Sequence, residues 1–220
     1  MFYTDIGELV HVIGRKTSKG IRLLGTAFFI NKAGILASAA HVTEYDDTDL
    51  VMIHRLRSIQ DYQDTSDKNV KCTKLKIKEI NPLTDVCLLE SPIKIQSQLE
   101  ISSTDAIHVG ESVSLFGFPH CDHERMVLTQ QDTIVGAKIL IDVKGIKTKN
   151  IVLNIQARPG QSGSPVISSA NKNVAAILIG SYAPISPGRI DIGVLIHKLY
   201  IKPRMQFLHH IFRRCYDEFH

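Results

Sequence analysis

The chain has 220 residues, of which 44% are apolar and 22% charged, with 14 glycines and 8 prolines, which are the proportions of an ordinary globular protein. Its formal charge of +4 is too small to indicate a particular partner. No run approaches the roughly 20 apolar residues of a membrane span, and the first residues carry Asp5 and Glu8 without a basic segment, which excludes a secretory signal.

Short β-like runs separated by turns fill most of the chain. They are rich in Val, Ile, Leu and Thr and are bounded by Gly, Asn, Asp and Pro, which is typical of an all-β barrel or sandwich. The polar stretch 57–69 predicts a long exposed loop. The expected strands are 26–30, 35–40, 50–56, 72–77, 86–90, 112–118, 133–143, 151–156, 165–169, 174–181 and 192–196.

Helical periodicity is clear only at the C-terminal end. Pro203 suits the first position of a helix, and apolar residues from Leu208 to Cys215 recur at spacings of three and four. We therefore expect one helix over about residues 203–218. The cations between Lys198 and Arg214 fit the solvated face of this helix, so we expect neither a nucleic-acid nor a membrane partner.

The cysteines favour a reducing compartment. They are few for the length and widely spaced, which suits free thiols better than a disulfide framework. With no secretory signal and no membrane span, the sequence predicts a cytoplasmic protein. The cysteines are Cys72, Cys87, Cys121 and Cys215.

The segment "GQSGSP" at residues 160–165 makes Ser162 a candidate nucleophile. A serine hydroxyl needs a nearby base, and the base needs an orienting group. His41 ends a strand, turn and strand whose last residues are small, which lets its ring face a cleft. Asp85 directly precedes an apolar strand and can be shielded, whereas the aspartates at 46, 47, 49, 61, 64 and 67 lie in polar segments and are expected to be solvated.

The segment "HCDHE" at residues 120–124 contains ligand types for zinc in His120, Cys121 and His123. A structural zinc site needs four ligands, commonly from two separated pairs, and no second pair is evident. We expect an exposed loop here, with no metal and no cofactor in the protein.

Four segments together resemble the chymotrypsin-like serine proteases, most closely their HtrA/Deg-like branch. They are "GTAFFINKAGILASAAHV", "NPLTDVCLLE", "STDAIHVGESVSLFGFP" and "ARPGQSGSPV", followed by "VAAILIGS" and "IGVLI", and they span most of residues 25–197 in that family's order. The ending GSP is also similar to glutamyl endopeptidases and some viral polyprotein proteases. No segment large enough for a PDZ domain follows Ile196, so we expect none.

The resemblance implies one trypsin-like peptidase domain over residues 1–220, built of two six-stranded antiparallel β-barrels over about 1–105 and 106–200. The active site would lie between them. His41 would take the proton from Ser162 and pass it to the leaving amine through an acyl-enzyme, while Asp85 orients the imidazole. The backbone N–H groups of Gly160 and Ser162 would form the oxyanion hole.

The resemblance also places the substrate pocket. Its base would lie near Gln156 and its wall at Ile179, Gly180 and Ser181, which predicts a protein or peptide substrate with a neutral, small or medium apolar residue before the scissile bond. Asp191 is the one nearby feature that would instead favour a basic residue.

Gln161 stands where the secreted digestive branch has an aspartate that pairs with a new N-terminus. We therefore expect an enzyme that needs no N-terminal zymogen cleavage. Two other functions stay open at this stage: a catalytically silent binding or scaffold protein with a protease fold, and a viral-type protease that processes a polyprotein.

Overall fold

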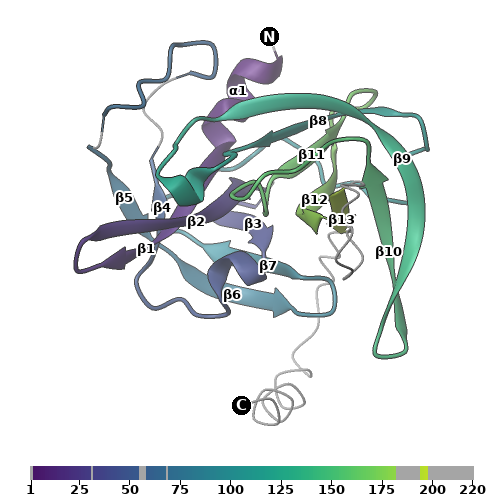
Figure 1. Ribbon diagram of the computed structural model, residues 1–220, viewed down its shortest axis with the longest axis horizontal. Coiled ribbons are helices and arrows are strands. Elements are labelled where there is room, and N and C mark those ends of the chain that lie inside the picture. The colour runs from purple at the N-terminus through teal and green to yellow at the C-terminus, as the bar shows by residue number, and fades with distance from the viewer. Residues whose placement is uncertain (1, 31, 55–57, 68, 182–193, 198–220) are drawn as a thin grey trace, which may run out of the picture.

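The computed structural model describes residues 2–30, 32–54, 58–67, 69–181 and 194–197. Figure 1 shows two curled antiparallel sheets side by side, the first from the purple and blue half of the chain and the second from the teal and green half. This confirms the predicted all-β double barrel. The expected C-terminal helix at 203–218 lies outside the described residues. Within them, no helix is long and apolar enough to cross a bilayer.

The first sheet has seven strands where six were expected. Its two edge strands, β5 (Cys72–Lys74) and β6 (Lys76–Asn81), are separated in the chain by Leu75 alone. Leu75 is buried, and its N–H donates to the Leu50 carbonyl at 2.9 Å. One run of chain is therefore divided between both edges, and the sheet curls round to meet itself. In spatial order the strands are β5 (Cys72–Lys74), β4 (Leu50–Ile53), β1 (Val10–Thr17), β2 (Gly20–Phe29), β3 (Ile35–Ala39), β7 (Val86–Glu90) and β6 (Lys76–Asn81).

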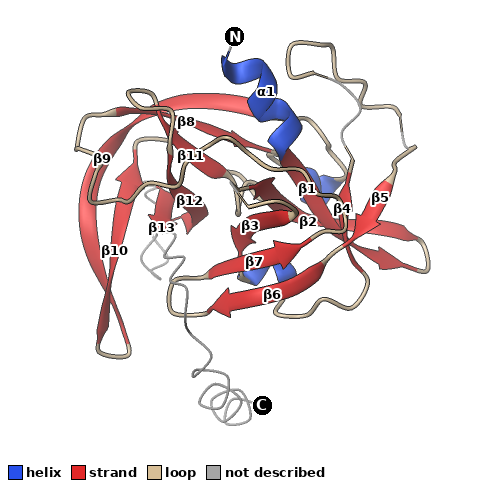
Figure 2. Ribbon diagram, turned by 180° about the vertical axis from the view of Figure 1, so that it is seen from behind, coloured by secondary structure: helices blue, strands red, loops and turns tan. Residues whose placement is uncertain are grey.

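The second sheet is a closed barrel of six strands, as predicted. β9 (Thr129–Val143) begins four residues before the expected start and forms with β10 (Ile146–Leu153) a long hairpin on the outer side of the molecule (Figures 1 and 2). The barrel order is β10 (Ile146–Leu153), β13 (Val194–His197), β12 (Val174–Ser181), β11 (Pro165–Ser168), β8 (Ser112–Gly117) and β9 (Thr129–Val143).

The N-terminal elements were not predicted. The structure has a short helix, α1 (Phe2–Leu9), followed by β1. The run from Val10 to Ile13 is buried throughout and shows no alternation of buried and exposed residues, and a glycine such as Gly14 is typical of a turn. In the structure a Cβ at Gly14 would lie 2.7 Å from the Arg22 carbonyl oxygen, so this glycine allows β1 and β2 to approach each other within the sheet.

Apolar side chains from both sheets pack into one cluster at the seam between them. Val10 and Phe28 from the first sheet share this cluster with Phe116, Ile167 and Ile177 from the second. All five are buried. The hydrophobic effect therefore fixes the two sheets against each other along this seam, and the segment that contains Ser162 begins beside it.

Candidate active site

His41 and Asp85 are brought together by the pairing of β3 with β7. Ala39 lies opposite Val86 in this antiparallel pair, so the residues just beyond each are neighbours, and the Ala40 N–H donates to the Asp85 carbonyl at 2.9 Å. His41 opens the 3-10 helix η1 (His41–Thr43) at this point. The predicted proximity of the two residues follows directly from the strand register.

The Asp85 carboxylate binds His41 twice. Its Oδ2 lies 2.5 Å from His41 Nδ1, and its Oδ1 accepts the His41 backbone N–H at 2.9 Å. A carboxylate only accepts, so Nδ1 carries the proton and Nε2 is left to accept one. The Asp85 side chain is 24% exposed, against 55% for Asp46, as its shielded position before β7 predicted. Its φ of 51° shows that the backbone adopts the left-handed region there.

Hydrogen bonds and ion pairs from Arg15 and Arg22 hold the segment from Thr43 to Asp46 that follows His41. Arg15, on β1, donates to the carbonyls of Thr43 and Asp46 at 2.8 and 2.9 Å and lies 3.3 Å from the Glu44 carboxylate. Arg22 donates to the same carboxylate at 2.7 Å, and this hydrogen bond is the main reason that the pKa of Glu44 is lowered. These contacts were not predicted, because β1 itself was not.

Ser162 lies half-buried in the segment between β10 and β11 and is held from the first sheet. The Thr26 N–H donates to the Ser162 carbonyl at 2.9 Å. A Cβ at Gly25 would lie 2.7 Å from Val42 Cγ1 and 3.0 Å from the Ser162 carbonyl oxygen, so the chain next to His41 and the chain of Ser162 flank the same glycine. Within the described residues, no hydrogen bond joins the Ser162 hydroxyl to His41.

Gly160 adopts a φ of +89°, where an L side chain is strained, and a Cβ there would lie 2.5 Å from the Phe118 carbonyl oxygen. The carbonyls of Pro159 and Gly160 are both bound: the His120 N–H donates to the Pro159 carbonyl at 2.6 Å, and the Thr26 hydroxyl donates to the Gly160 carbonyl at 2.9 Å. The N–H groups of Gly160 and Ser162 donate to no other described residue, as the donors of an oxyanion hole must.

Gln161 is fully buried and bound at both ends of its amide. Its Oε1 accepts the Arg158 N–H at 2.8 Å, and its Nε2 donates to Gln131 Oε1 on β9 at 2.5 Å. The side chain thus connects the segment of Ser162 to the second barrel without an ion pair.

The residues predicted for the substrate pocket lie close to this segment in the chain and in the sheet. Gln156 is exposed on the same connection as Ser162. Ile179 occupies an irregularity of β12 between Leu178 and Gly180, and its side chain packs against the core of the first sheet. Ser181 ends β12, and Asp191 lies outside the described residues.

The "HCDHE" segment is not an exposed loop as a whole, which corrects the sequence prediction. Cys121 is fully buried at the start of the 3-10 helix η2 (Cys121–His123), and a Cβ at Gly160 would lie 2.7 Å from its Sγ. Burial raises the pKa of the Cys121 thiol to about 12, so this cysteine is a neutral packing group against the segment of Ser162. His120 and His123 place their ring centroids 6.3 Å apart.

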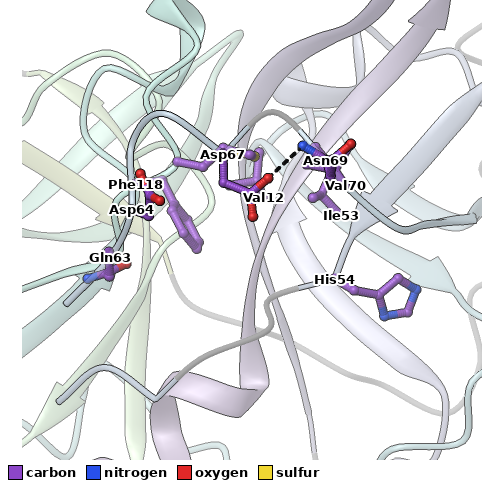
Figure 3. A pocket seen from close by; sticks show the side chains of 10 residues that line it. Val12, Ile53, His54, Gln63, Asp64, Asp67, Asn69, Val70 and Phe118 are labelled. Atoms are coloured by element: carbon purple, nitrogen blue, oxygen red, sulfur yellow. Dashed lines mark hydrogen bonds between the residues drawn. The ribbon is translucent and has the colours of Figure 1, made fainter. Parts of the chain in front are cut away.

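A cavity of about 300 Å³ lies elsewhere, between the first sheet, the loop at 63–70 and Phe118. Figure 3 shows Asp64, Asp67 and His54 at its edge and the hydrogen bond from the Asn69 N–H to Asp67 that shapes the loop. None of the residues that line it belongs to the predicted site.

A family model described as a trypsin-like peptidase domain matches residues 25–177, and no curated protein matches the chain. Among solved structures it is similar to the HtrA-type protease AlgW with a decapeptide (17% identity, TM-score 0.64, covering 90% of this chain and 64% of that chain).

Two further structures have the same fold. One is the active form of the Rv3671c protease from M. tuberculosis (17% identity, TM-score 0.65, covering 90% of this chain and 78% of that chain). The other is the MamO protease domain from Magnetospirillum magneticum (11% identity, TM-score 0.63, covering 90% and 94%).

Proposed function

The chain belongs to the trypsin-like peptidase family, and from this membership we propose that it is a serine endopeptidase with His41, Asp85 and Ser162 as its catalytic residues. The observation that carries the proposal is the double contact between the Asp85 carboxylate and His41. It holds both the ring and the backbone of the histidine and sets the tautomer that a general base needs.

The proposed mechanism follows from this tautomer. Nε2 of His41 takes the proton of the Ser162 hydroxyl as its oxygen attacks the peptide carbonyl, and Asp85 stabilises the imidazolium that forms. The C–N bond then breaks, the amine leaves with the proton from His41, and an ester on Ser162 remains. Water, activated by the same histidine, hydrolyses this acyl-enzyme and restores the hydroxyl.

The oxyanion of each tetrahedral intermediate would be bound by the N–H groups of Gly160 and Ser162. Their lack of another partner among the described residues supports this role, since a preorganised donor must be available before the charge develops. Loss of one such donor typically reduces turnover by about 10²–10³-fold.

Activity without zymogen cleavage is also part of the proposal. The contacts of Gln161 with Arg158 and Gln131 support it, because they satisfy the buried side chain within the second barrel. Deletion of residues 1–5 from the N-terminus is the test: we expect it to leave the reactivity of Ser162 unchanged. An increase from a silent full-length protein would contradict this.

For the substrate, we propose a protein or peptide with a neutral, small or medium apolar residue before the scissile bond, cleaved in the cytoplasm. The lack of a charged residue among the predicted pocket positions Gln156, Ile179, Gly180 and Ser181 supports this preference. A cleavage profile from a peptide library tests it, and a profile dominated by Arg or Lys would overturn it.

Reaction with a fluorophosphonate probe tests the proposal as a whole. We expect labelling of the wild-type protein and none of Ser162→Ala or His41→Ala, each checked for folding by circular dichroism. The second candidate, a silent binding protein, is favoured by the missing hydrogen bond between Ser162 and His41. Labelling that is absent from the wild type, or that persists in Ser162→Ala, would favour it.

A further inference from the structure

We propose that Thr26 is a positioning residue, whose hydroxyl holds the carbonyl of Gly160 and thereby fixes the turn at Gly160 and Gln161 that carries the two oxyanion N–H groups, those of Gly160 and Ser162. This inference rests on the proposed function, because it assigns a role within the same site. Neither the trypsin-like peptidase match nor the expected triad assigns a role to the side chain at this position.

Every polar group of Thr26 contacts the nucleophile segment or its supports. Its N–H donates to the Ser162 carbonyl at 2.9 Å, and its carbonyl accepts the Ser38 hydroxyl at 2.7 Å. Its hydroxyl donates to the Gly160 carbonyl at 2.9 Å and accepts the Phe118 N–H at 3.3 Å. The residue is fully buried, so water does not compete for these bonds.

Thr26 also lies directly against Gly163, in the segment that contains Ser162. A Cβ at Gly163 would lie 1.9 Å from the Thr26 carbonyl oxygen and 2.5 Å from Ser38 Oγ. β2 of the first sheet is therefore in direct backbone contact with the segment of Ser162. A side chain on Thr26 is placed to reach across the seam and fix that segment.

The hydroxyl matters because Gly160 has more conformational freedom than any other residue type. The N–H and C=O of a trans peptide point in opposite directions, so a peptide that rotates carries its N–H away from the oxyanion. The Gly160 N–H belongs to the peptide before Gly160, whose carbonyl accepts the His120 N–H, and the Thr26 hydroxyl binds the carbonyl of the peptide after Gly160. The peptides on both sides of Gly160 are therefore held, which keeps in place the turn that carries the N–H groups of Gly160 and Ser162. The other described donor to the Gly160 carbonyl is Cys121 Sγ, at 3.9 Å, and a thiol is a weak donor.

The backbone contacts of Thr26 do not depend on its side chain, but the hydroxyl bond does. Thr26→Val keeps the shape and the β-branch and removes the donor, while Thr26→Ser keeps the donor and removes a methyl group. A role in packing alone would make the serine variant the worse of the two. A role in positioning makes the valine variant the worse.

The experiment measures the rate of Ser162 labelling by a fluorophosphonate, and kcat and KM for p-nitrophenyl acetate, in the wild type, Thr26→Val and Thr26→Ser. We expect Thr26→Val to lower the labelling rate and kcat by about 10–100-fold, less than loss of an oxyanion donor itself, with KM unchanged. Thr26→Ser should stay within about threefold of the wild type. Equal rates in all three proteins, or equal losses in both variants, would overturn the inference.

Hydrogen exchange over residues 158–163 provides a readout that does not need activity. We expect faster exchange in this segment for Thr26→Val and wild-type exchange for Thr26→Ser. If the wild type is not labelled at all, the proposed function fails, and the exchange rates still decide the role of Thr26. Thr26→Ala, which adds no volume, replaces the valine variant if that variant does not fold, and unchanged exchange in the hydroxyl-free variant would overturn the inference.

Discussion

Replacement of Asp85 by asparagine tests the orienting contact without disturbing the backbone. Asp85 adopts a φ of 51°, a left-handed conformation that asparagine tolerates better than most residues. The two side chains are also nearly equal in size. Asp85→Asn should therefore preserve the turn before β7 and change only which atoms donate and accept.

The structure dictates how the new amide will sit. The His41 backbone N–H needs an acceptor, so the amide oxygen takes the place of Oδ1, and the NH₂ group faces Nδ1 at the place of Oδ2. Nδ1 must then accept, and the proton moves to Nε2, which can no longer take the proton of Ser162. In a serine protease this wrong tautomer lowers kcat roughly 10⁴-fold, a loss of about 5 kcal/mol of transition-state stabilisation.

The assay is the rate of fluorophosphonate labelling at pH 7, alongside thermal unfolding to show that the variant is folded. Asp49→Asn is the matched control, because Asp49 is an exposed aspartate eight positions after His41 in the chain, with a φ of 55°, and it should label at the wild-type rate. A labelling rate for Asp85→Asn within threefold of the wild type would refute the proposed role of Asp85.

Three further predictions concern the supports of the site. Gly163→Ala should abolish labelling and lower the free energy of unfolding by about 3 kcal/mol or more, because the new Cβ would meet the Thr26 carbonyl oxygen. Gly110→Ala is the control, because Gly110 has a φ of +86° and no atom close to the place of a Cβ. In urea unfolding it should lower the free energy of unfolding by only about 1–2 kcal/mol. Gln131→Ala should lower the free energy of unfolding by about 1–3 kcal/mol, since the buried Gln161 amide loses its acceptor, and an unchanged urea midpoint would contradict this. Burial raises the pKa of Cys87 from 9.0 to about 12, so between these pH values the folded protein keeps a proton that the unfolded chain releases. The contribution of Cys87 to the free energy of unfolding is therefore full below pH 9 and falls as pH rises towards 12, by about 1.4 kcal/mol per pH unit. Urea midpoints between pH 8 and 11 measure this fall, and an equal fall in Cys87→Ala would show that this thiol is not its cause.

The sequence was sufficient to predict those residues of the candidate site that a local pattern identifies. His41 at the end of a strand of small residues and Asp85 before an apolar strand were predicted as partners, and the pairing of β3 with β7 brings them into contact. Local patterns failed at the N-terminus, where Gly14 obscured β1. They also failed at Cys121, which lies in a polar segment but is buried, because burial depends on what packs above a residue.

By itself, the sequence determined the all-β class, most of the strands after residue 25 and the residue types needed for acyl transfer, since strand periodicity and turn residues are local properties of the chain. Only the tertiary structure decided which residues support Ser162. Thr26 is 134 positions from Gly160, and Gln131 is 30 positions from Gln161. Such contacts depend on how two curled sheets meet at one apolar seam, and this packing is a property of the whole fold rather than of any single segment.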